Sequence, residues 1–533
     1  MKAFAHLLDT LGNTQSRNRK TALLARYFRD TPDPDRGYAL AALTDGLPPK
    51  LIGRLPLRRM LGDLTSRFID PVLYKLSRDY VGDTAETVAL LWPDTSVARA
   101  NTDPTLNDVI MAMREGTTGE RSEALGRLLD GLDTSGRWAL LKLLGGAPRV
   151  GVSARLAKTA LAEAFGQDVS DVEELWHALE VPYTDLFAWL EGRGPKPDPG
   201  SKPVFRPVML AHPIEDEDWP KLSADDFTAE WKWDGIRVQI AAAGGDVRVF
   251  SRQGDDVSAA FPEIRSAFLP YDCVADGELL VLRSGDIAPF NDLQQRLNRK
   301  VVTAKMLRDY PAHVRLYDLL FEEDQDLRAL PFANRRARLE AWHAKHRPPL
   351  TDLSALVPFA SFEALRAIWS ATRDDGIEGL MLKRRDSSYQ AGRVKGQWFK
   401  WKRAALTLDC VLMYAQRGSG KRSSFYSDYT FGVWRDNDGG GVELVPVGKA
   451  YSGFTDDELR LLDKWVRANT METFGPVRAV TPGLVLEVAF DAVQTSTRHK
   501  SGVAMRFPRI HRIRWDKPAA EADTLATVKA LIG

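Results

Sequence analysis

A run of proline and glycine divides this chain into two parts with different hydrophobic patterns. Residues 191–207 read EGRGPKPDPGSKPVFRP. Proline cannot continue a helix interior or a central strand, and glycine at this density adds backbone freedom, so no regular element is expected here. The stretch is predicted to be a semi-rigid linker between domains. At 533 residues the chain is long enough for about three of them.

The residues before the linker are predicted to be almost entirely helical. Apolar residues recur at helical spacing from the first segment onward, as between Phe4 and Leu11. Ser153 is predicted to be the N-cap of one helix, and Ser170 with Glu173 has the pattern of a capping box at the start of the next. An all-α domain is therefore expected over residues 1–200.

The hydrophobic pattern changes after the linker. Residues 201–404 alternate strand-like runs with helical segments, for example a strand-like run at 272–282 and a helical one at 331–346. From residue 405 the pattern becomes short strands separated by polar turns, which is typical of a small antiparallel barrel. An α+β domain over 201–404 and a β-barrel domain over 405–533 are predicted.

Composition excludes several classes of protein. Apolar residues make up 44% and charged residues 27%, as in globular proteins, and no apolar run approaches the ~20 residues of a membrane span. The start, MKAFAHLLD, meets a charge too early for a signal peptide. Cys273 and Cys410 are the only cysteines, which excludes a disulfide framework and a four-cysteine zinc site. A cytoplasmic protein that does not contact a membrane is expected.

Charge is balanced overall but clustered locally. The chain has 73 basic and 72 acidic residues, so no global field indicates a nucleic-acid partner. Eight lysines and arginines nevertheless fall within 383–403 against one acid, and six fall within 500–517 against one acid. Such clusters are most often solvated faces, but their interleaved aromatic residues raise the prospect of a polyanionic ligand.

The segment EWKWDGIR, residues 230–237, combines a lysine with two carboxylates on one strand face. In strict alternation Glu230, Lys232 and Asp234 share one face, and the two tryptophans share the other. Gly235 then suits a tight turn or a close backbone approach. Taken alone, the segment fits a half-buried strand with local ion pairs better than a reactive lysine in a walled pocket.

Further charged groups interrupt otherwise apolar strands of the α+β region. They are Asp276 and Glu278, Tyr317 with Asp318, Glu378 and Lys383, and Lys400 with Lys402. Buried charges are costly unless they are paired or face a common cleft. Glu378 and Lys383 would point to opposite faces in strict alternation, so a bulge is inferred near Gly379.

This inventory suits one kind of chemistry. Lysine is a nucleophile only after its ammonium loses a proton, which nearby cations or a metal can promote. Attack on a nucleotide α-phosphate also needs Mg²⁺ and basic groups to neutralise the phosphates, carboxylates to hold the metal, and an aromatic ring for the base.

At this point the chain resembles the ATP-dependent DNA ligases of the covalent nucleotidyltransferase superfamily, and among them the bacterial three-domain type with a helical DNA-binding domain. The motifs occur in the family order and cover nearly the whole chain. They are EWKWDGIR (230–237), SRQG (251–254), DGEL (276–279), LYDLL (316–320), EGLMLK (378–383), WFKWK (398–402), and RFPR (506–509) running on to RWDK (514–517). The resemblance implies an all-α N-terminal domain, an α+β nucleotidyltransferase core of the ATP-grasp-like ligase type and a β-barrel OB-fold domain.

The resemblance also implies residue roles in a first reaction with ATP. Lys232 would attack the α-phosphate, form a lysyl-AMP and release pyrophosphate. ATP and AMP would be held by a set of side chains around it, with Glu230 reading the adenine amino group and Tyr317 stacking on the base. Arg237 and Arg252 would hold the ribose and phosphates, and Lys383, Lys400 and Lys402 would neutralise the α-phosphate. The remaining members of the set are Glu278 and, by the weakest match, Arg393. Glu278 and Glu378 would hold Mg²⁺ or Mn²⁺.

Later steps would involve DNA. AMP would move to the 5′-phosphate of a nick in duplex DNA, and the 3′-hydroxyl would displace it, in repair or replication. Arg514, Asp516 and Lys517 would orient pyrophosphate during the first step only, so a hinge is expected near residues 403–407. The enzyme is expected to be monomeric and to act at the bacterial nucleoid. Candidate DNA contacts lie in two glycine-containing loops and one basic strand: Arg149, Ser153, Arg417, Lys421, Arg506 and Arg509.

Three alternatives are open at this stage. An RNA ligase or capping-type guanylyltransferase shares the core motifs but does not explain the long helical N-terminal part. An NAD-dependent ligase would be expected to carry a cysteine zinc module that two cysteines cannot supply. A non-catalytic DNA-binding scaffold would not need every catalytic position to be filled.

Overall fold

The structure is a computed structural model of the whole chain. It describes residues 1–532 except 15, 45, 53–55, 94–102, 147, 201, 298, 300, 373–375, 403–404, 419–425, 438–439, 452–455 and 498. Lys421 and the first two residues of the predicted hinge lie outside the described residues. The chain divides into two compact units, Met1–Ala154 with Ala404–Gly533, and Arg155–Arg403. The predicted three-domain division stays a prediction.

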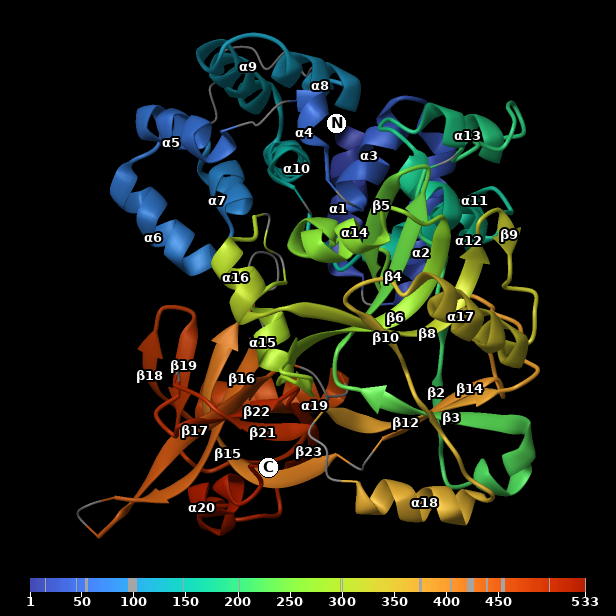
Figure 1. Cartoon of the computed structure of the whole chain (residues 1–533). Helices are drawn as coiled ribbons and strands as arrows, with labels where there is room; N and C mark the ends of the chain where they lie inside the picture. Colours follow the sequence, from blue (N-terminus) through green and yellow to red (C-terminus); the bar gives the residue numbers. More distant parts are fainter. Residues whose placement is uncertain are drawn as a thin grey trace. The chain divides into compact units, whose positions relative to one another are not determined.

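Helices form the whole N-terminal region, as predicted (Figure 1). They are α1 (Lys2–Asn13), α2 (Arg17–Asp30), α3 (Asp35–Leu43), α4 (Pro49–Ile52), α5 (Leu57–Phe68), α6 (Pro71–Val81), α7 (Thr84–Leu91), α8 (Leu106–Arg114), α9 (Thr118–Gly131), α10 (Thr134–Gly145), α11 (Ala154–Ala164), α12 (Val169–Leu175) and α13 (Thr184–Leu190). Side chains such as Leu8, Leu24 and Leu140 are fully buried between them. Capping boxes begin α8 and α9, where Thr105 and Thr117 exchange hydrogen bonds with the third residue of each helix.

Two of the predicted helix starts had different outcomes. Helix α11 begins at the residue after Ser153, as expected. The capping box at Ser170 is wrong: α12 begins at Val169, and Asp168 is the N-cap that accepts a hydrogen bond from the Ser170 amide at 2.7 Å. Asp168 stands two residues earlier and offers a carboxylate to the free amides of the first turn, so the helix starts there.

The described residues of the linker at 191–207 form no helix or strand, as predicted. Its C-terminal end is nevertheless fixed to the second unit. Val204 and Phe205 are buried, and the Arg206 amide donates to Gln239 Oε1 at 2.5 Å. The Arg206 guanidinium also pairs with Glu174 of α12 at 3.2 Å.

Two mainly antiparallel sheets form the core of the second unit (Figure 1). The larger sheet has the order β10-β8-β6-β4-β5, with β7 and β9 at its margins, and the smaller one has the order β11-β3-β12-β14-β2. Their strands are β2 (His212–Pro213), β3 (Phe227–Trp233), β4 (Ile236–Ala243), β5 (Asp246–Ser251), β6 (Cys273–Arg283), β7 (Asp286–Ile287), β8 (Ala312–Glu322), β9 (Gln325–Asp326), β10 (Thr351–Leu353), β11 (Leu356–Val357), β12 (Ile377–Arg384) and β14 (Trp398–Lys402). The short strands β1 (Met209–Leu210) and β13 (Gly392–Arg393) pair with each other.

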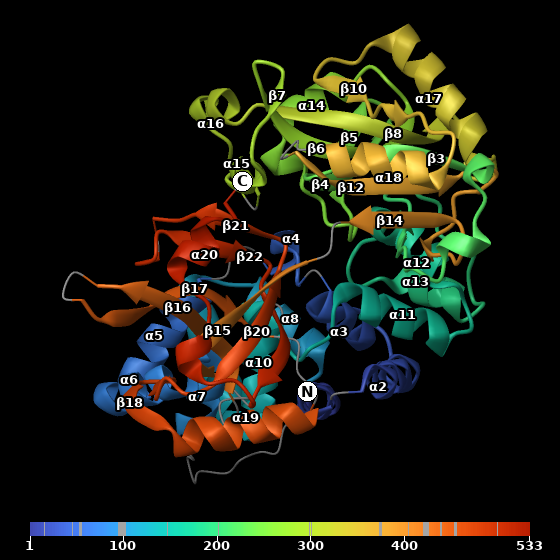
Figure 2. The same cartoon turned by 90° about the horizontal axis from the view of Figure 1, so that it is seen from below.

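Helices cover one face of each sheet. Leu339 and Trp342 of α17 (Phe332–His346) pack into the core of the larger sheet. Leu365 and Trp369 of α18 (Phe362–Ala371) pack on Leu380 of β12, and Figure 2 shows α18 lying along that strand. The opposite face of the larger sheet is partly apolar, where Ala241, Phe250 and Leu320 form a second buried cluster.

The C-terminal region consists of antiparallel strands and two helices. The elements are β15 (Leu406–Arg417), β16 (Tyr426–Asp436), β17 (Val442–Ala450), α19 (Asp456–Ala468), β18 (Thr470–Phe474), β19 (Val477–Val480), β20 (Val485–Phe490), β21 (Ala492–Thr495), β22 (Val503–Arg506), β23 (Arg509–Arg514) and α20 (Leu525–Lys529). The region consists mainly of strands, as predicted, and closure of the barrel stays a prediction. No helix in the described ranges is long and apolar enough to cross a membrane.

Candidate active site

Three neighbouring strands of the smaller sheet carry most of the predicted basic residues. Residues directly opposite each other in antiparallel strands share a face. Gly379 of β12 pairs with Lys232 of β3 on one side and with Lys402 of β14 on the other. Two residues further along, Met381 lies between Glu230 and Lys400. Strand pairing therefore places four of the predicted site residues on one face of this sheet.

A β-bulge brings Glu378 to the same face. The register of β12 against β3 shifts between Ile377 and Gly379, which confirms the bulge inferred from the sequence. Lys232 Nζ forms an ion pair and hydrogen bond with Glu378 Oε2, and Lys402 Nζ lies 3.0 Å from the same oxygen. Burial alone would raise the pKa of Glu378, but the two lysines outweigh it and hold the pKa at about 2.

Glycines are required at three of the motifs because neighbouring strands pass too close for a side chain. A Cβ on Gly379 would lie 2.3 Å from the Trp401 carbonyl oxygen. A Cβ on Gly235 would lie 2.6 Å from the Leu279 carbonyl oxygen, and one on Gly277 would lie 2.6 Å from a Val314 methyl carbon. The close approach predicted at Gly235 is therefore made by strand β6.

Glu230 and Lys383 form a buried pair. Lys383 Nζ donates to Glu230 Oε2 at 3.1 Å, and each side chain is 2% exposed. Burial raises the pKa of Glu230 and lowers the pKa of Lys383. Glu230 Oε1 is buried without a hydrogen-bond partner in the described structure, although an Arg336 nitrogen lies 3.8 Å away. An acceptor oxygen of this kind fits the predicted contact with an adenine amino group.

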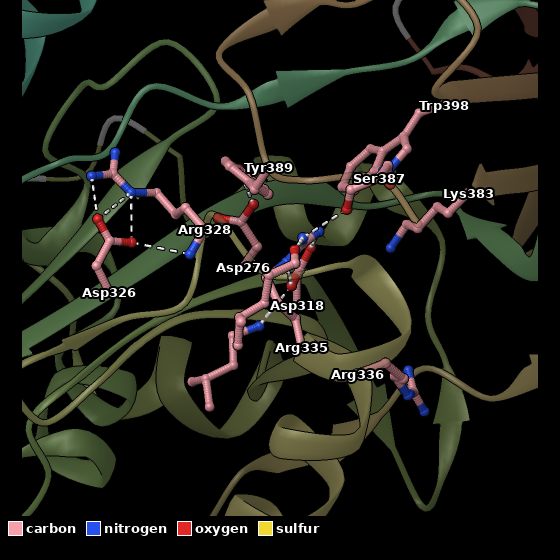
Figure 3. Close-up of polar contacts among 12 residues, drawn as sticks. Asp276, Asp318, Asp326, Arg328, Arg335, Arg336, Lys383, Ser387, Tyr389 and Trp398 are labelled. Carbon is pink, nitrogen blue, oxygen red and sulfur yellow. Dashed lines mark hydrogen bonds and ion pairs between the residues drawn. The ribbon is translucent and has the colours of Figure 1, made fainter. Parts of the chain in front are cut away.

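Lys383 lies on the same sheet face as Lys400 and Lys402, two residues beyond Met381 on β12, and its ammonium is paired with Glu230. Its Nζ is 4.5 Å from the centre of the Tyr317 ring, a cation–π distance, and Figure 3 shows its ammonium pointing toward the buried polar cluster. Lys400 pairs with Met381 and Lys402 pairs with Gly379 in the neighbouring strand. The predicted contact of Lys383 with the α-phosphate stays a prediction.

The larger sheet contributes Arg237, whose guanidinium is held inside the protein. It donates to Asp276 Oδ2 at 2.6 Å, to the Met209 carbonyl at 2.5 Å and to the Tyr389 hydroxyl at 3.0 Å. Tyr389 donates to the same Asp276 oxygen at 2.5 Å. Arg237 therefore links β4, β6 and β1, and its predicted contact with the ribose is untested.

Glu278 is a site carboxylate whose pKa is raised. It lies opposite Arg237, and within the described ranges it makes no hydrogen bond or ion pair. Burial raises its pKa to about 7; Lys232 and Arg237 oppose the shift, while Glu378 and Asp234 add to it. These influences indicate that Glu278 lies close to Lys232 and Glu378.

The raised pKa of Glu278 predicts an effect on stability. Its ordinary pKa is 4.5, so below pH 4.5 the carboxyl group is protonated in both the folded and the unfolded chain. As pH rises from 4.5 to 7, the unfolded chain releases the proton while the folded chain keeps it, so the free energy of unfolding falls. Above pH 7 the carboxyl group is ionised in both states, and the free energy of unfolding has fallen by the full amount. Glu278→Gln is expected to raise the free energy of unfolding at pH 8 by up to about 3 kcal/mol, seen as a higher Tm, and to leave it unchanged at pH 4. Glu217→Gln, at an exposed position, is the control; an equal gain at both pH values would contradict the assignment.

Basic side chains gather near Lys400. Burial, followed by the charges of Arg393, Lys402, Lys232 and Arg252, lowers the pKa of Lys400. Arg393, the residue with the weakest motif match, therefore lies in the same cluster as the strongest ones. The arrangement provides a positive surface that suits phosphates.

The sequence did not indicate Arg335 and Tyr389 as buried partners of the predicted carboxylates (Figure 3). Asp318 and Arg335 are both fully buried and form a bidentate pair, with Nε–Oδ1 at 2.9 Å and Nη2–Oδ2 at 3.0 Å. Asp318 lies within β8, which continues to Glu322. Tyr389 has no sequence signal, since its partner Asp276 lies 113 residues away.

The predicted first-step residues of the C-terminal region lie in the other compact unit. Arg514 Nη2 pairs with Asp516 at 2.8 Å, and Lys517 Nζ pairs with Asp409 at 2.8 Å. Of the candidate DNA contacts, Arg149 is exposed and has a positive φ of 58°. The others that the structure describes are the helix-preceding residue Ser153, Arg417 at the end of β15, Arg506 at the end of β22, and Arg509, which lies 3.7 Å from Asp491.

The carboxylates near Lys232 fit a metal ion held mainly by phosphates and water. Among the described residues no group of three or more His, Cys, Asp or Glu side chains could hold one. Mg²⁺ in nucleotide sites takes one or two carboxylates and completes its shell with phosphates and water. Glu278, whose pKa is raised, and Glu378 provide the two carboxylates that such a Mg²⁺ site needs.

Family models match three successive regions of the chain. "DNA ligase N terminus" matches residues 1–162, "ATP dependent DNA ligase domain" matches 208–402, and "ATP dependent DNA ligase C terminal region" matches 422–517. The middle match contains all the sheet residues described above.

Whole-length relatives agree with these matches. A "Probable DNA ligase" of Koribacter versatilis is 32% identical over 569 aligned residues, which cover 98% of this chain and 95% of the relative. One from Streptomyces avermitilis is 33% identical over 543 residues, covering 99% and 98%. A solved structure titled "Pmar-Lig_PreS3" is similar in fold, with a TM-score of 0.56 and 17% identity over 96% of this chain and 99% of that one. The chain therefore belongs to the ATP-dependent DNA ligases, enzymes that join DNA through phosphodiester bonds.

Proposed function

We propose that this ligase seals nicks with a 5′-phosphate and a 3′-hydroxyl in duplex DNA, with Lys232 as the residue that becomes adenylated. The observation that carries the proposal is the position of Lys232. It lies on a sheet face between Glu378 and a cluster of basic side chains, close to Glu278. A lysine that needs only an ion pair would not require two carboxylates and so many cations around it.

The first step transfers AMP to Lys232. Its Nζ attacks the α-phosphorus of ATP, a P–N bond forms, and the P–O bond to pyrophosphate breaks. An ammonium has no lone pair, so the ion pair with Glu378 has to open and Lys232 has to lose a proton. Glu378, with a pKa of about 2, is too weak a base to keep that proton, so the proton passes to solvent. Lys400 and Lys402 neutralise the α-phosphate as charge develops.

Recognition of ATP uses the buried residues next to Lys232. Glu230 Oε1 accepts a hydrogen bond from the adenine amino group, and Tyr317 stacks on the base. Arg252 and Arg393 contact phosphate or ribose oxygens, while Arg237 contributes mainly by holding Asp276 and the strands around the pocket. Glu278 and Glu378 would hold Mg²⁺ or Mn²⁺, which when bound neutralises phosphate charge and replaces the proton on Glu278.

The later steps use the same pocket with DNA as the substrate. The 5′-phosphate oxygen at the nick attacks the AMP phosphorus and releases Lys232, giving a DNA-adenylate. The 3′-hydroxyl then attacks the 5′-phosphate and AMP leaves. Arg514, Asp516 and Lys517 act in the first step only, where they orient pyrophosphate. The enzyme works as a monomer in bacterial DNA repair or replication.

Phosphate contacts predict that binding to nicked duplex weakens steeply with salt. Each phosphate neutralised releases counterions, so the logarithm of the association constant falls with the logarithm of salt by about 0.9 per contact. Arg149→Gln is expected to weaken binding on all sequences and to reduce the slope by about 1. Arg26→Gln, on an exposed α2 side chain, is the matched control. Affinity that is flat in salt, or equal slopes for wild type and Arg149→Gln, would contradict the contact.

Sealing of synthetic nicks tests the proposed function. The wild-type protein is incubated with a nicked duplex, Mg²⁺ and either ATP or NAD, and the joined strand is measured on a denaturing gel. Joining of all-DNA strands with ATP alone is expected. Joining that is faster when the strands are RNA would instead favour the RNA-ligase alternative.

A further inference from the structure

Two carboxylates of the C-terminal region lie directly opposite each other in the sheet. Asp409 of β15 pairs with Glu487 of β20. Directly opposed residues of an antiparallel pair share a face, with Cβ atoms about 4.5–5.5 Å apart, and like charges at such positions destabilise the sheet. Both side chains are mostly covered, at 14% and 17% exposure, so solvent screens them poorly. Two negative charges this close together need nearby positive side chains to offset their repulsion.

The cations are the two residues assigned to pyrophosphate. Lys517 Nζ lies 2.8 Å from Asp409 Oδ2, and Arg514 Nη1 lies 3.5 Å from the same oxygen. The same Arg514 nitrogen lies 3.7 Å from Glu487. Among the described residues Asp409 is therefore the one carboxylate in contact with both cations, whereas Glu487 also binds Arg512 at 2.7 Å.

The backbone at Asp409 is fixed from the other side. Its amide donates to Asp523 Oδ2 at 2.8 Å, and the Asp523 amide donates to the Asp409 carbonyl at 2.9 Å. Asp409 Oδ1 is buried without a hydrogen-bond partner in the described structure. A carboxylate held this rigidly, with half of its hydrogen-bonding capacity unused, is costly for stability alone.

We propose that Asp409, assisted by Glu487, is a positioning residue for the first step. It holds Arg514 and Lys517 side by side as a preformed pair of cations for the pyrophosphate leaving group. Every contact lies within the C-terminal region, so the arrangement moves with that region wherever the region is placed. Preorganisation of this kind removes the cost of ordering two long side chains as the leaving group departs.

The inference rests on the proposed first-step role of Arg514 and Lys517, and a step-resolved assay tests both. Asp409→Asn keeps the shape and one acceptor but removes the charge. It is expected to slow self-adenylation about 10-fold or more and to leave sealing of a pre-adenylated nick within about twofold of wild type. Asp409→Glu is expected to recover part of the rate. Glu443→Gln, which removes an ion pair with Arg435 elsewhere in this region, is the control and should change neither step.

The double variant with Lys517→Met separates the outcomes. If Asp409 acts through Lys517 and Arg514, Asp409→Asn adds less than its full loss of self-adenylation in a chain that already carries Lys517→Met, because only Arg514 is left to be misplaced. Full multiplication of the two losses, or equal loss of both steps by Asp409→Asn with or without a fall in Tm, overturns the positioning role. Full self-adenylation by Lys517→Met itself would instead overturn the proposed function of this motif.

Discussion

Lys232→Ala is expected to abolish ATP-dependent sealing and to retain sealing of a nick that already carries AMP on its 5′-phosphate. The lysine is the nucleophile of the first step. Lys402 contacts the same Glu378 oxygen, but it comes from β14 and is assigned to neutralise the α-phosphate. Once AMP is on the DNA, that nucleophile is no longer needed. A loss of 10³-fold or more in the first step is expected, since the covalent intermediate cannot form.

The assay compares both substrates with one set of proteins. Joined strands are measured for an ordinary nick with ATP and for the pre-adenylated nick without ATP. Lys305→Ala, at an exposed position in the same compact unit, is the matched control and should act as wild type on both. Substantial sealing of the ordinary nick by Lys232→Ala would remove Lys232 from the reaction.

Arg335→Met is expected to cause the largest loss of stability among single changes near the site. Its guanidinium and the Asp318 carboxylate are both fully buried, and Arg335 also donates to the carbonyls of Leu330 at 2.6 Å and Ser387 at 3.0 Å (Figure 3). The change leaves the Asp318 charge buried without its partner, which costs about 3–5 kcal/mol. Unfolding in urea of the full chain, followed by tryptophan fluorescence, measures the loss.

Two comparisons separate the lost pair from the lost packing. Arg338→Met lies on the same helix, but its ion pair with Glu322 is exposed, so a loss of less than about 1 kcal/mol is expected. The double variant Asp318→Leu with Arg335→Met is expected to recover part of the loss, because no buried charge remains. A cost for Arg335→Met as small as that for Arg338→Met would contradict the account.

The sequence pattern predicted a structural element correctly where the contacts that form the element are close together in the sequence. Helical spacing predicted the N-terminal helices, and proline density predicted the linker. The conflict in alternation between Glu378 and Lys383 predicted the bulge at Gly379, because strand geometry allows no other way for both to share a face. The capping box at Ser170 failed because two nearby residues competed to cap the same helix, and pattern alone did not rank Asp168 above Ser170.

Contacts between distant strands could not be predicted in the same way. Arg237 was expected to face the ligand, but strand register places Asp276 within reach of it, and Tyr389 completes the pair. The resemblance grouped Lys383 with Lys400 and Lys402, but the sequence did not show that its ammonium would pair with Glu230 of the neighbouring strand. Alternation within one strand shows which sheet face a side chain occupies. Which residue lies opposite it depends on the register between two strands, and a single sequence does not specify that register.

Uptake of label from ATP tests the central claim most directly. The wild-type protein is incubated with α-labelled ATP and Mg²⁺, denatured, digested and analysed by mass spectrometry. One covalent AMP is expected, on the peptide that contains Lys232, as an acid-labile phosphoramidate that pyrophosphate removes from the native enzyme. Absence of covalent label, or AMP on any other residue, would contradict the assignment of Lys232 as the nucleophile.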